Sequence, residues 1–163
     1  MIGQSRPGYP RSQVLGGPAS ENRHKEVTWQ TEPVEHVSTN SAGRHRAQLL
    51  SGLPVTERRL QVAGVSTMVL EGGAGPPIIL LHGPGDFAGM WMRVLPDLVT
   101  THRVVAPDLP GHGTSELVEG WLDADGLRAW LSGLIERTCA SPPVLIGHVL
   151  GGAIGARFAV GPR

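Results

Sequence analysis

The chain has 163 residues, which fits one domain of ordinary size, and its 14 lysines and arginines balance 14 aspartates and glutamates. A net charge of zero gives no electrostatic attraction to nucleic acid or to an anionic membrane, so we expect neither as a partner. The single cysteine, Cys139, excludes an intrachain disulfide, and no apolar run is long enough to span a bilayer.

Residues 1–52 carry few large apolar side chains, and proline and glycine interrupt every window of possible helix or strand periodicity. A segment of this composition buries too little apolar surface to offset the entropy lost on ordering. We therefore expect a disordered N-terminal extension over residues 1–52 and a folded domain over residues 53–163. No apolar stretch follows Arg6 and Arg11, so no secretion signal is predicted and a cytoplasmic protein is expected.

From Pro54 onward, the sequence has the periodicity of regular secondary structure. Thr56–Val62 and Val65–Leu70 alternate between apolar and polar residues and are joined near Gly64, which predicts a β-hairpin. After a glycine-rich loop, Ile78–Leu81 forms a continuous aliphatic run. Such a run is typical of a strand that is buried on both faces of a parallel sheet.

The segment Phe87–Val99 carries apolar residues at helical spacing, which predicts a helix. Pro96 lies inside this pattern, and because proline disrupts a helix interior, we expect the helix to end or kink near Leu95. Val104–Ala106 is the next short aliphatic run, and it predicts a second buried strand.

The last third of the chain predicts a helix, a strand and a helix in turn. Asp123 or Asp125 is placed to cap a helix that runs to about Thr138. Val144–Ile146 predicts a third buried strand, and Gly152–Val160 predicts a further helix. The apolar face of the first of these helices consists of Leu127, Trp130, Leu131, Leu134 and Ile135. This alternation after the hairpin predicts an α/β domain with a mostly parallel sheet, right-handed crossovers and flanking helices.

Three glycine-containing turns each follow a predicted buried strand, at the end where open α/β sheets place their ligand sites. The turns are His82-Gly83-Pro84-Gly85, then Asp108-Leu109-Pro110-Gly111-His112-Gly113-Thr114-Ser115, then Gly147-His148-Val149-Leu150-Gly151-Gly152. In order and spacing they resemble the His-Gly loop, the D-x-P-G-x-G-x-S loop and the G-x-S-x-G nucleophile elbow of the α/β-hydrolase superfamily. The resemblance covers about Pro54 to Arg163, which corresponds to the N-terminal half of that fold.

The resemblance implies both a chemistry and a division of roles among these residues. Intact relatives hydrolyse small molecules of the ester, amide or epoxide type and generally need no cofactor and no metal, so we expect none here. The elbow glycines Gly147 and Gly151 lie on either side of a sharp turn that contains His148, because larger side chains would collide with the strand or the helix. A structural loop, with no catalytic side chain, is implied for Asp108, Gly111, His112, Gly113 and Ser115.

Val149 occupies the elbow position at which the resemblance implies a serine. An isopropyl group has no lone pair and no labile proton, so we predict that this chain is catalytically incompetent as it stands. A β-branched residue is also poorly suited to the positive φ of an elbow. We therefore expect a corner strained by about 1–3 kcal/mol, or one that has relaxed to ordinary helical geometry.

The resemblance also implies an acid, a histidine and an oxyanion hole, and this sequence does not supply all of them. The resemblance places the acid after a later strand and the histidine near the C-terminus, and neither precedes Arg163, so we expect a truncated domain. The oxyanion hole would use the N–H of Leu150 and that of the residue after Gly83. That residue is Pro84, which has no N–H, so the amide of Gly85 would have to replace it.

These observations leave three functions open. The first is a hydrolase by family resemblance, without a competent triad. The second is a non-catalytic interaction protein that binds a second copy, or a separate C-terminal half, through the unpaired edge of strand Val144–Ile146. The third is the truncated product of a decayed or split gene, with no function of its own.

Overall fold

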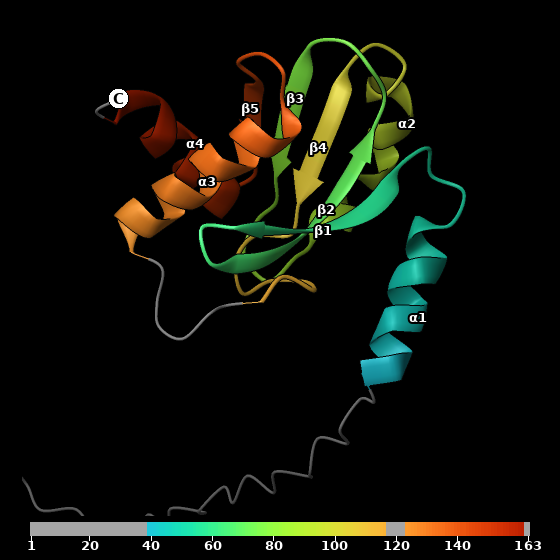
Figure 1. Ribbon diagram of the computed structural model, residues 1–163. Coiled ribbons are helices and arrows are strands. Elements are labelled where there is room, and N and C mark those ends of the chain that lie inside the picture. Colours follow the sequence, from blue (N-terminus) through green and yellow to red (C-terminus); the bar gives the residue numbers. More distant parts are fainter. Residues whose placement is uncertain (1–38, 117–122, 162–163) are drawn as a thin grey trace, which may run out of the picture. The chain divides into compact units, whose positions relative to one another are not determined.

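The computed structural model describes residues 39–116 and 123–161 (Figure 1). In chain order, the elements are α1 (Thr39–Leu50), β1 (Thr56–Val62), β2 (Val65–Gly72), β3 (Pro77–Leu81), the 3-10 helix η1 (Ala88–Arg93), α2 (Leu95–Leu98), β4 (Arg103–Pro107), α3 (Ala124–Thr138), β5 (Val144–Gly147) and α4 (Leu150–Val160). No helix in this part of the chain is both long and apolar enough to cross a bilayer.

The five strands form one mixed sheet in the order β1-β2-β4-β3-β5. β1 pairs with β2 and β2 with β4 in antiparallel fashion, whereas β4, β3 and β5 run parallel. The predicted α/β class and the predicted hairpin are confirmed. A mostly parallel sheet was expected, but the hairpin is part of the sheet, so two of the four strand pairings are antiparallel. Glu71 of β2 helps to fix this arrangement, because its buried carboxylate pairs with Arg58 of β1 and Arg103 of β4.

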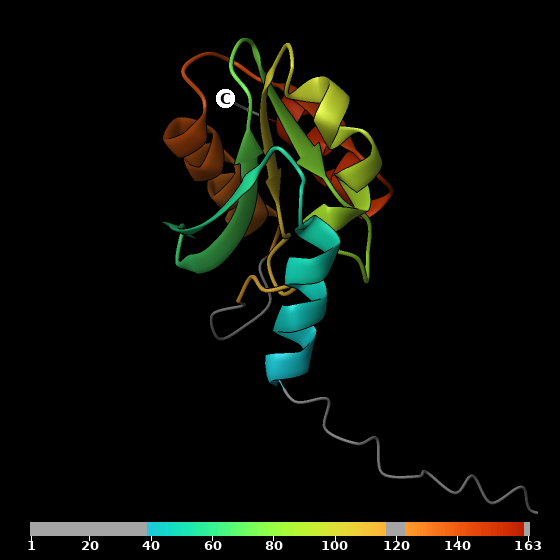
Figure 2. The same cartoon turned by 90° about the vertical axis from the view of Figure 1, so that its right-hand side faces the viewer.

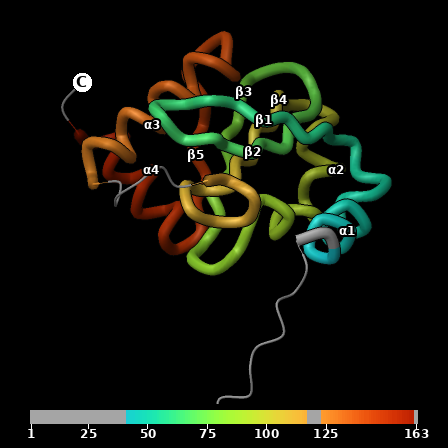
Figure 3. The backbone as a smooth tube through the Cα atoms, turned by 60° about the horizontal axis from the view of Figure 1, so that its bottom comes forward, coloured from blue at the N-terminus to red at the C-terminus, as the bar shows by residue number. Residues whose placement is uncertain are grey.

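Helices cover both faces of the sheet (Figures 1, 2 and 3). α3 and α4 pack on one face, where Ile79, Leu81 and Val105 of the strands meet Trp130 and Ile154 of the helices. η1 and α2 pack on the opposite face around a second buried cluster. The predicted apolar face of α3 is confirmed, since its members are buried or packed against the first cluster: Leu127, Trp130, Leu131, Leu134 and Ile135.

Two short helical pieces replace the single helix expected over Phe87–Val99. η1 ends before Val94, and α2 begins at Leu95, so the interruption lies next to the expected place. Pro96 is in the first turn of α2, where its missing N–H costs no helical hydrogen bond. The proline therefore helps to start the second piece instead of ending the first.

Helix α1 corrects the disorder expected for residues 1–52, because Thr39–Leu50 is helical; residues 1–38 lie outside the described part of the chain. A side chain anchors this polar helix to the domain. The Arg46 guanidinium pairs with Glu57 at 2.6 Å and with Asp108 at 2.9 Å, and it lies 4.9 Å from the centre of the Phe87 ring. The expectation of disorder rested on the low number of apolar residues, and such a count cannot reveal that Arg46 fastens α1 to the domain.

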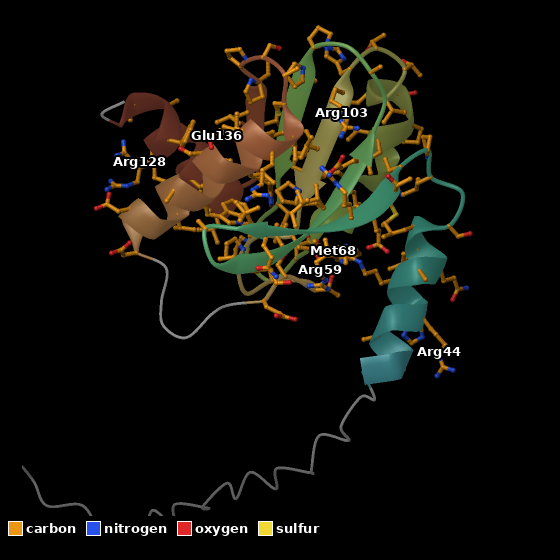
Figure 4. All side chains as sticks on the ribbon, in the orientation of Figure 1. Arg44, Arg59, Met68, Arg103, Arg128 and Glu136 are labelled. Carbon is orange, nitrogen blue, oxygen red and sulfur yellow. The ribbon has the colours of Figure 1, made fainter. Side chains whose placement is uncertain are left out.

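Side chains of the hairpin connect β1 and β2 with a neighbouring loop. Arg59 lies opposite Met68, and Figure 4 shows these two residues side by side. The Arg59 guanidinium donates to Ser66 Oγ and to the carbonyl of Thr114, both at 3.0 Å. The hairpin is thereby joined to the loop that follows β4.

Candidate functional site

The candidate site is the corner at which β5 ends and α4 begins. The chain turns through His148 and Val149, and Leu150 is the first residue of the helix. The His148 N–H donates to the Leu81 carbonyl at 2.9 Å, and the Gly151 N–H donates to the His82 carbonyl at 3.2 Å. These bonds hold the corner directly beside the end of β3 and the first glycine-containing turn.

Glycine is required at the corner because the backbone segments approach one another too closely for a side chain. A Cβ on Gly147 would collide with the backbone of Gly151 and Gly152, and a Cβ on Gly151 would collide with the Leu81 carbonyl. Gly83 lies against the His148 ring, where an added Cβ would be 2.6 Å from Nδ1. The spacing of these glycines is therefore dictated by packing and does not depend on the residue at position 149.

Val149 retains the strained conformation of an elbow, with φ of 47° and ψ of −102°. Of the two geometries expected, the strained one is present and relaxation to ordinary helical angles is not. A valine in this region costs about 1–3 kcal/mol relative to a relaxed conformation. The residue is 66% exposed, so burial of the isopropyl group offsets little of that cost.

Three residues near the corner are those at which the sequence analysis expected an oxyanion hole: Leu150, Pro84 and Gly85. Leu150 begins α4, and the first N–H groups of a helix have no acceptor within the helix. Pro84 has no N–H to offer. The next residue, Gly85, has a left-handed φ of 72°, which is a turn conformation that favours glycine.

His82 connects the first turn with the second. Its ring is fully buried; Nε2 accepts from the Leu109 N–H at 2.8 Å, and Nδ1 lies 2.7 Å from the Gly83 carbonyl. These two contacts fix the proton on Nδ1, so the imidazole is neutral. Burial lowers the pKa of His82, which agrees with a neutral ring. The sequence analysis used this histidine only as a marker of the turn.

Asp108 organises the second turn from inside it. The fully buried carboxylate accepts from the backbone N–H groups of Ala88 at 2.8 Å and Thr114 at 2.9 Å, and it pairs with Arg46. Gly113 has a φ of 55°, and a Cβ there would collide with the carboxylate. One acidic group therefore joins η1, its own loop and α1.

The remaining polar groups of the second turn also have partners within the fold. Ser115 Oγ donates to the Asp108 carbonyl at 2.8 Å and accepts from the Met68 N–H at 2.9 Å. The His112 ring packs edge-on against His82, with 5.4 Å between ring centroids, and Gly111 has a φ of 73°. The Met68 bond fastens the loop to β2, the His82 contact joins it to the first turn, and the Asp108 bond closes the loop on itself.

The described part of the chain offers a groove near the corner but no cluster of metal ligands. Within residues 39–116 and 123–161, no three histidine, cysteine, aspartate or glutamate side chains gather in a way that could hold a metal ion. An open groove of about 1000 Å³ lies between α3 and α4, with Arg128, Leu145 and Phe158 among its lining residues. It reaches the corner through Gly147 and Gly152, but Val149 does not line it.

Comparison with known proteins agrees with this geometry. Residues 78–162, just over half of the chain, match the model of the alpha/beta hydrolase family. The chain therefore belongs to the α/β-hydrolase family. The match includes all three turns and the two parallel crossovers that join them.

Individual relatives extend the match toward the N-terminus. A 2-hydroxy-6-oxo-2,4-heptadienoate hydrolase of Pseudomonas putida is 32% identical over 113 residues, covering 63% of this chain and 39% of the relative. A magnesium-chelatase 30 kDa subunit of Rhodobacter capsulatus is 34% identical over 107 residues, covering 63% and 37%. An epoxide hydrolase structure from Vigna radiata has a TM-score of 0.64 at 27% identity, covering 68% and 35%. The chain thus spans less than two fifths of the length of each of these proteins.

Proposed function

We propose that this chain is a non-catalytic member of the α/β-hydrolase family, whose nucleophile corner is built but chemically inert. The observation that carries the proposal is Val149, which has the strained backbone of an elbow and is exposed at the corner. Hydrolysis of an ester, amide or epoxide by this route needs an atom with a lone pair at that place. The backbone geometry is in place, and the reacting atom is missing.

Among the residues that the structure describes, the side chains near the corner offer no substitute nucleophile. Cys139 follows the last turn of α3, where its Sγ contacts Thr138 Oγ1 at 3.5 Å and its side chain packs against the apolar cluster. The His82 ring is buried and both of its nitrogens are engaged. His148 is exposed beside Val149, but its ring lies against Gly83 on the turn where the incomplete oxyanion hole would be.

A pair of variants tests the proposal directly. The full chain and Val149→Cys, both carrying Cys139→Ser, are incubated with 4-nitrophenyl acetate, and the acylated residue is identified by mass spectrometry. A thiol is intrinsically nucleophilic, and a helix N-terminus lowers its pKa, so Val149→Cys should form a thioester in a stoichiometric burst. The parent should show no burst and no adduct on residues 147–152. A burst from the parent, with an acyl group on any of these residues, would overturn the proposal.

The second candidate function is that of an interaction protein, and the exposed edge of the sheet favours it. Among the residues that the structure describes, β5 pairs only with β3. Val144 and Ile146 on this strand are 59% and 38% exposed. An apolar strand edge of this kind is a typical site for pairing with another chain.

A further inference from the structure

Helix α1 is only weakly favoured by its own sequence. It has 12 residues, a length at which an isolated helix is marginal in water, and Gly43 in its interior weakens it further. Its first turn has no acidic residue and its last turn has no basic residue, so the charges of its ends do not stabilise it. Between Ala42 and Leu49, every residue except Arg46 is exposed. The order of α1 therefore depends on its docking to the domain.

The docking of α1 centres on one arginine. The Arg46 side chain is only 10% exposed, and its guanidinium pairs with Glu57 and with Asp108. Among the described residues, none accepts a hydrogen bond from its buried Nη2 atom, and a buried donor without an acceptor is unfavourable. At the end of the helix, Leu50 packs against the second buried cluster. The docked helix thus combines strong ion pairs with an unsatisfied donor, which makes release of α1 easier than unfolding of the sheet.

The partners of Arg46 also hold the start of η1, which follows the first turn. Asp108 Oδ2 pairs with Arg46, and Oδ1 of the same carboxylate accepts from the Ala88 N–H at 2.8 Å. The Phe87 ring lies against the guanidinium, with 4.9 Å between the ring centre and Cζ. Asp108 directly follows β4, so these contacts place α1 at the carboxyl end of that strand (Figure 2). Arg46 therefore contacts Phe87 directly and Ala88 through one shared carboxylate.

Charge couples the helix to the turn. Asp108 is fully buried, and a buried carboxylate that loses its cation is strongly destabilised. When α1 leaves, this carboxylate reaches water only if the loop or the start of η1 moves. The Ala88 N–H is bound to the same group, so the segment that contains it opens with the helix.

We propose that α1 is a latch for the first turn, with Arg46 as its positioning residue. While Arg46 is docked, the chain from Gly83 to Ala88 is held beside the corner, where Gly83 lies against the His148 ring. When α1 is released, that segment is released with it. The order of α1 thereby sets the shape of the site from the N-terminal side of the domain. This coupling does not depend on whether the corner is catalytic.

Hydrogen exchange of the full chain at increasing denaturant concentration, resolved to single amides by NMR, tests the latch. We expect the amides of α1, Phe87 and Ala88 to exchange through one opening, with the same dependence on denaturant, before the amides of β3. Arg46→Gln should accelerate both sets by a common factor of about tenfold, and Arg44→Gln, at an exposed position of the same helix, should accelerate neither. Opening of α1 without Phe87 and Ala88, or opening of these two residues only together with β3, overturns the proposal.

Phe87→Leu tests the same coupling from the side of the turn. It removes the ring against the guanidinium and leaves the sequence of α1 unchanged. Because a cation–π contact is lost, the amides of α1 should exchange about threefold faster or more. Arg93→Gln, at an exposed position of η1, is the matched control and should leave the exchange of α1 as it is. If α1 exchanges at the parent's rate in Phe87→Leu, the turn does not hold the helix and the proposal is overturned.

Discussion

The corner after β5 and the loop after β4 match the family pattern in different ways. At the corner the backbone is retained, with Val149 at a φ of 47°, although the reactive side chain is absent. In the loop the polar side chains are retained, and Asp108 and Ser115 are buried and hydrogen-bonded. The turn is formed with a valine at position 149, whereas hydrogen bonds of buried polar groups hold the loop.

Physical reasons for the difference lie in how each region is held. The corner is shaped by close backbone approach, which glycine permits whatever side chain lies between the glycines. The loop is shaped by a buried charge whose partners would be left unpaired without it. We therefore expect a substitution at position 149 to cost less folding stability than the loss of a buried polar group of the loop.

The largest expected effect comes from Asp108→Ala. Removing the carboxylate leaves the N–H groups of Ala88 and Thr114, and the guanidinium of Arg46, without their buried acceptor. We expect a loss of about 3–5 kcal/mol in the free energy of unfolding, measured by chemical denaturation. Glu136→Ala on the exposed side of α3 (Figure 4) is the control and should change the same quantity by less than about 0.5 kcal/mol. A mild effect at position 108 would remove the distinction between the two regions.

A smaller loss should follow Arg46→Gln, which tests whether α1 belongs with the loop. The side chain bridges Glu57 and Asp108, and hydrogen bonds to charged groups contribute about 1.5–3 kcal/mol. We expect faster hydrogen exchange of the amides of α1, because the anchor is lost. Arg44→Gln alters the same helix at an exposed position and should leave the exchange as it is. Equal exchange in the two variants would show that α1 does not depend on the ion pairs.

Helix α1 also marks the limit of what the sequence could show. The hairpin, the three parallel strands and the apolar face of α3 were predictable because each has a local periodicity. The cap of α3 was predictable only as Asp123 or Asp125, and it is Asp123, whose carboxylate accepts from the Gly126 N–H at 2.8 Å. Arg46 and Asp108 are 62 positions apart, and an ion pair over that distance leaves no periodic signal. The same holds for the His82 contact with Leu109, which only the packed loops create.

The replacement Val149→Gly should act in the opposite direction from the loop variants. Glycine relieves the strain at positive φ, while the chain loses entropy and little burial, so the variant should be more stable by about 1 kcal/mol. Ala153→Gly, at an exposed position of α4, is the matched control and should be less stable by roughly 0.5–1 kcal/mol. Denaturation midpoints measure both changes. Destabilisation by Val149→Gly would mean that the strain is compensated by contacts of the isopropyl group.

The smallest expected effect is a pH dependence that couples the two regions through His82. Its carbonyl accepts from Gly151 at the corner, and its ring accepts from Leu109 of the loop. Burial lowers the pKa of His82 in the folded state, so the unfolded chain takes up a proton first as the pH falls. The free energy of unfolding contributed by this group is present above the unfolded pKa of about 6.5 and is lost as the pH falls through the folded pKa. In His82→Gln the fall of the unfolding free energy with pH should disappear, because an amide does not titrate in this range. His45→Gln alters the exposed side of α1 and should keep this pH dependence. If His82→Gln keeps this pH dependence, the neutral His82 ring does not couple the corner to the loop.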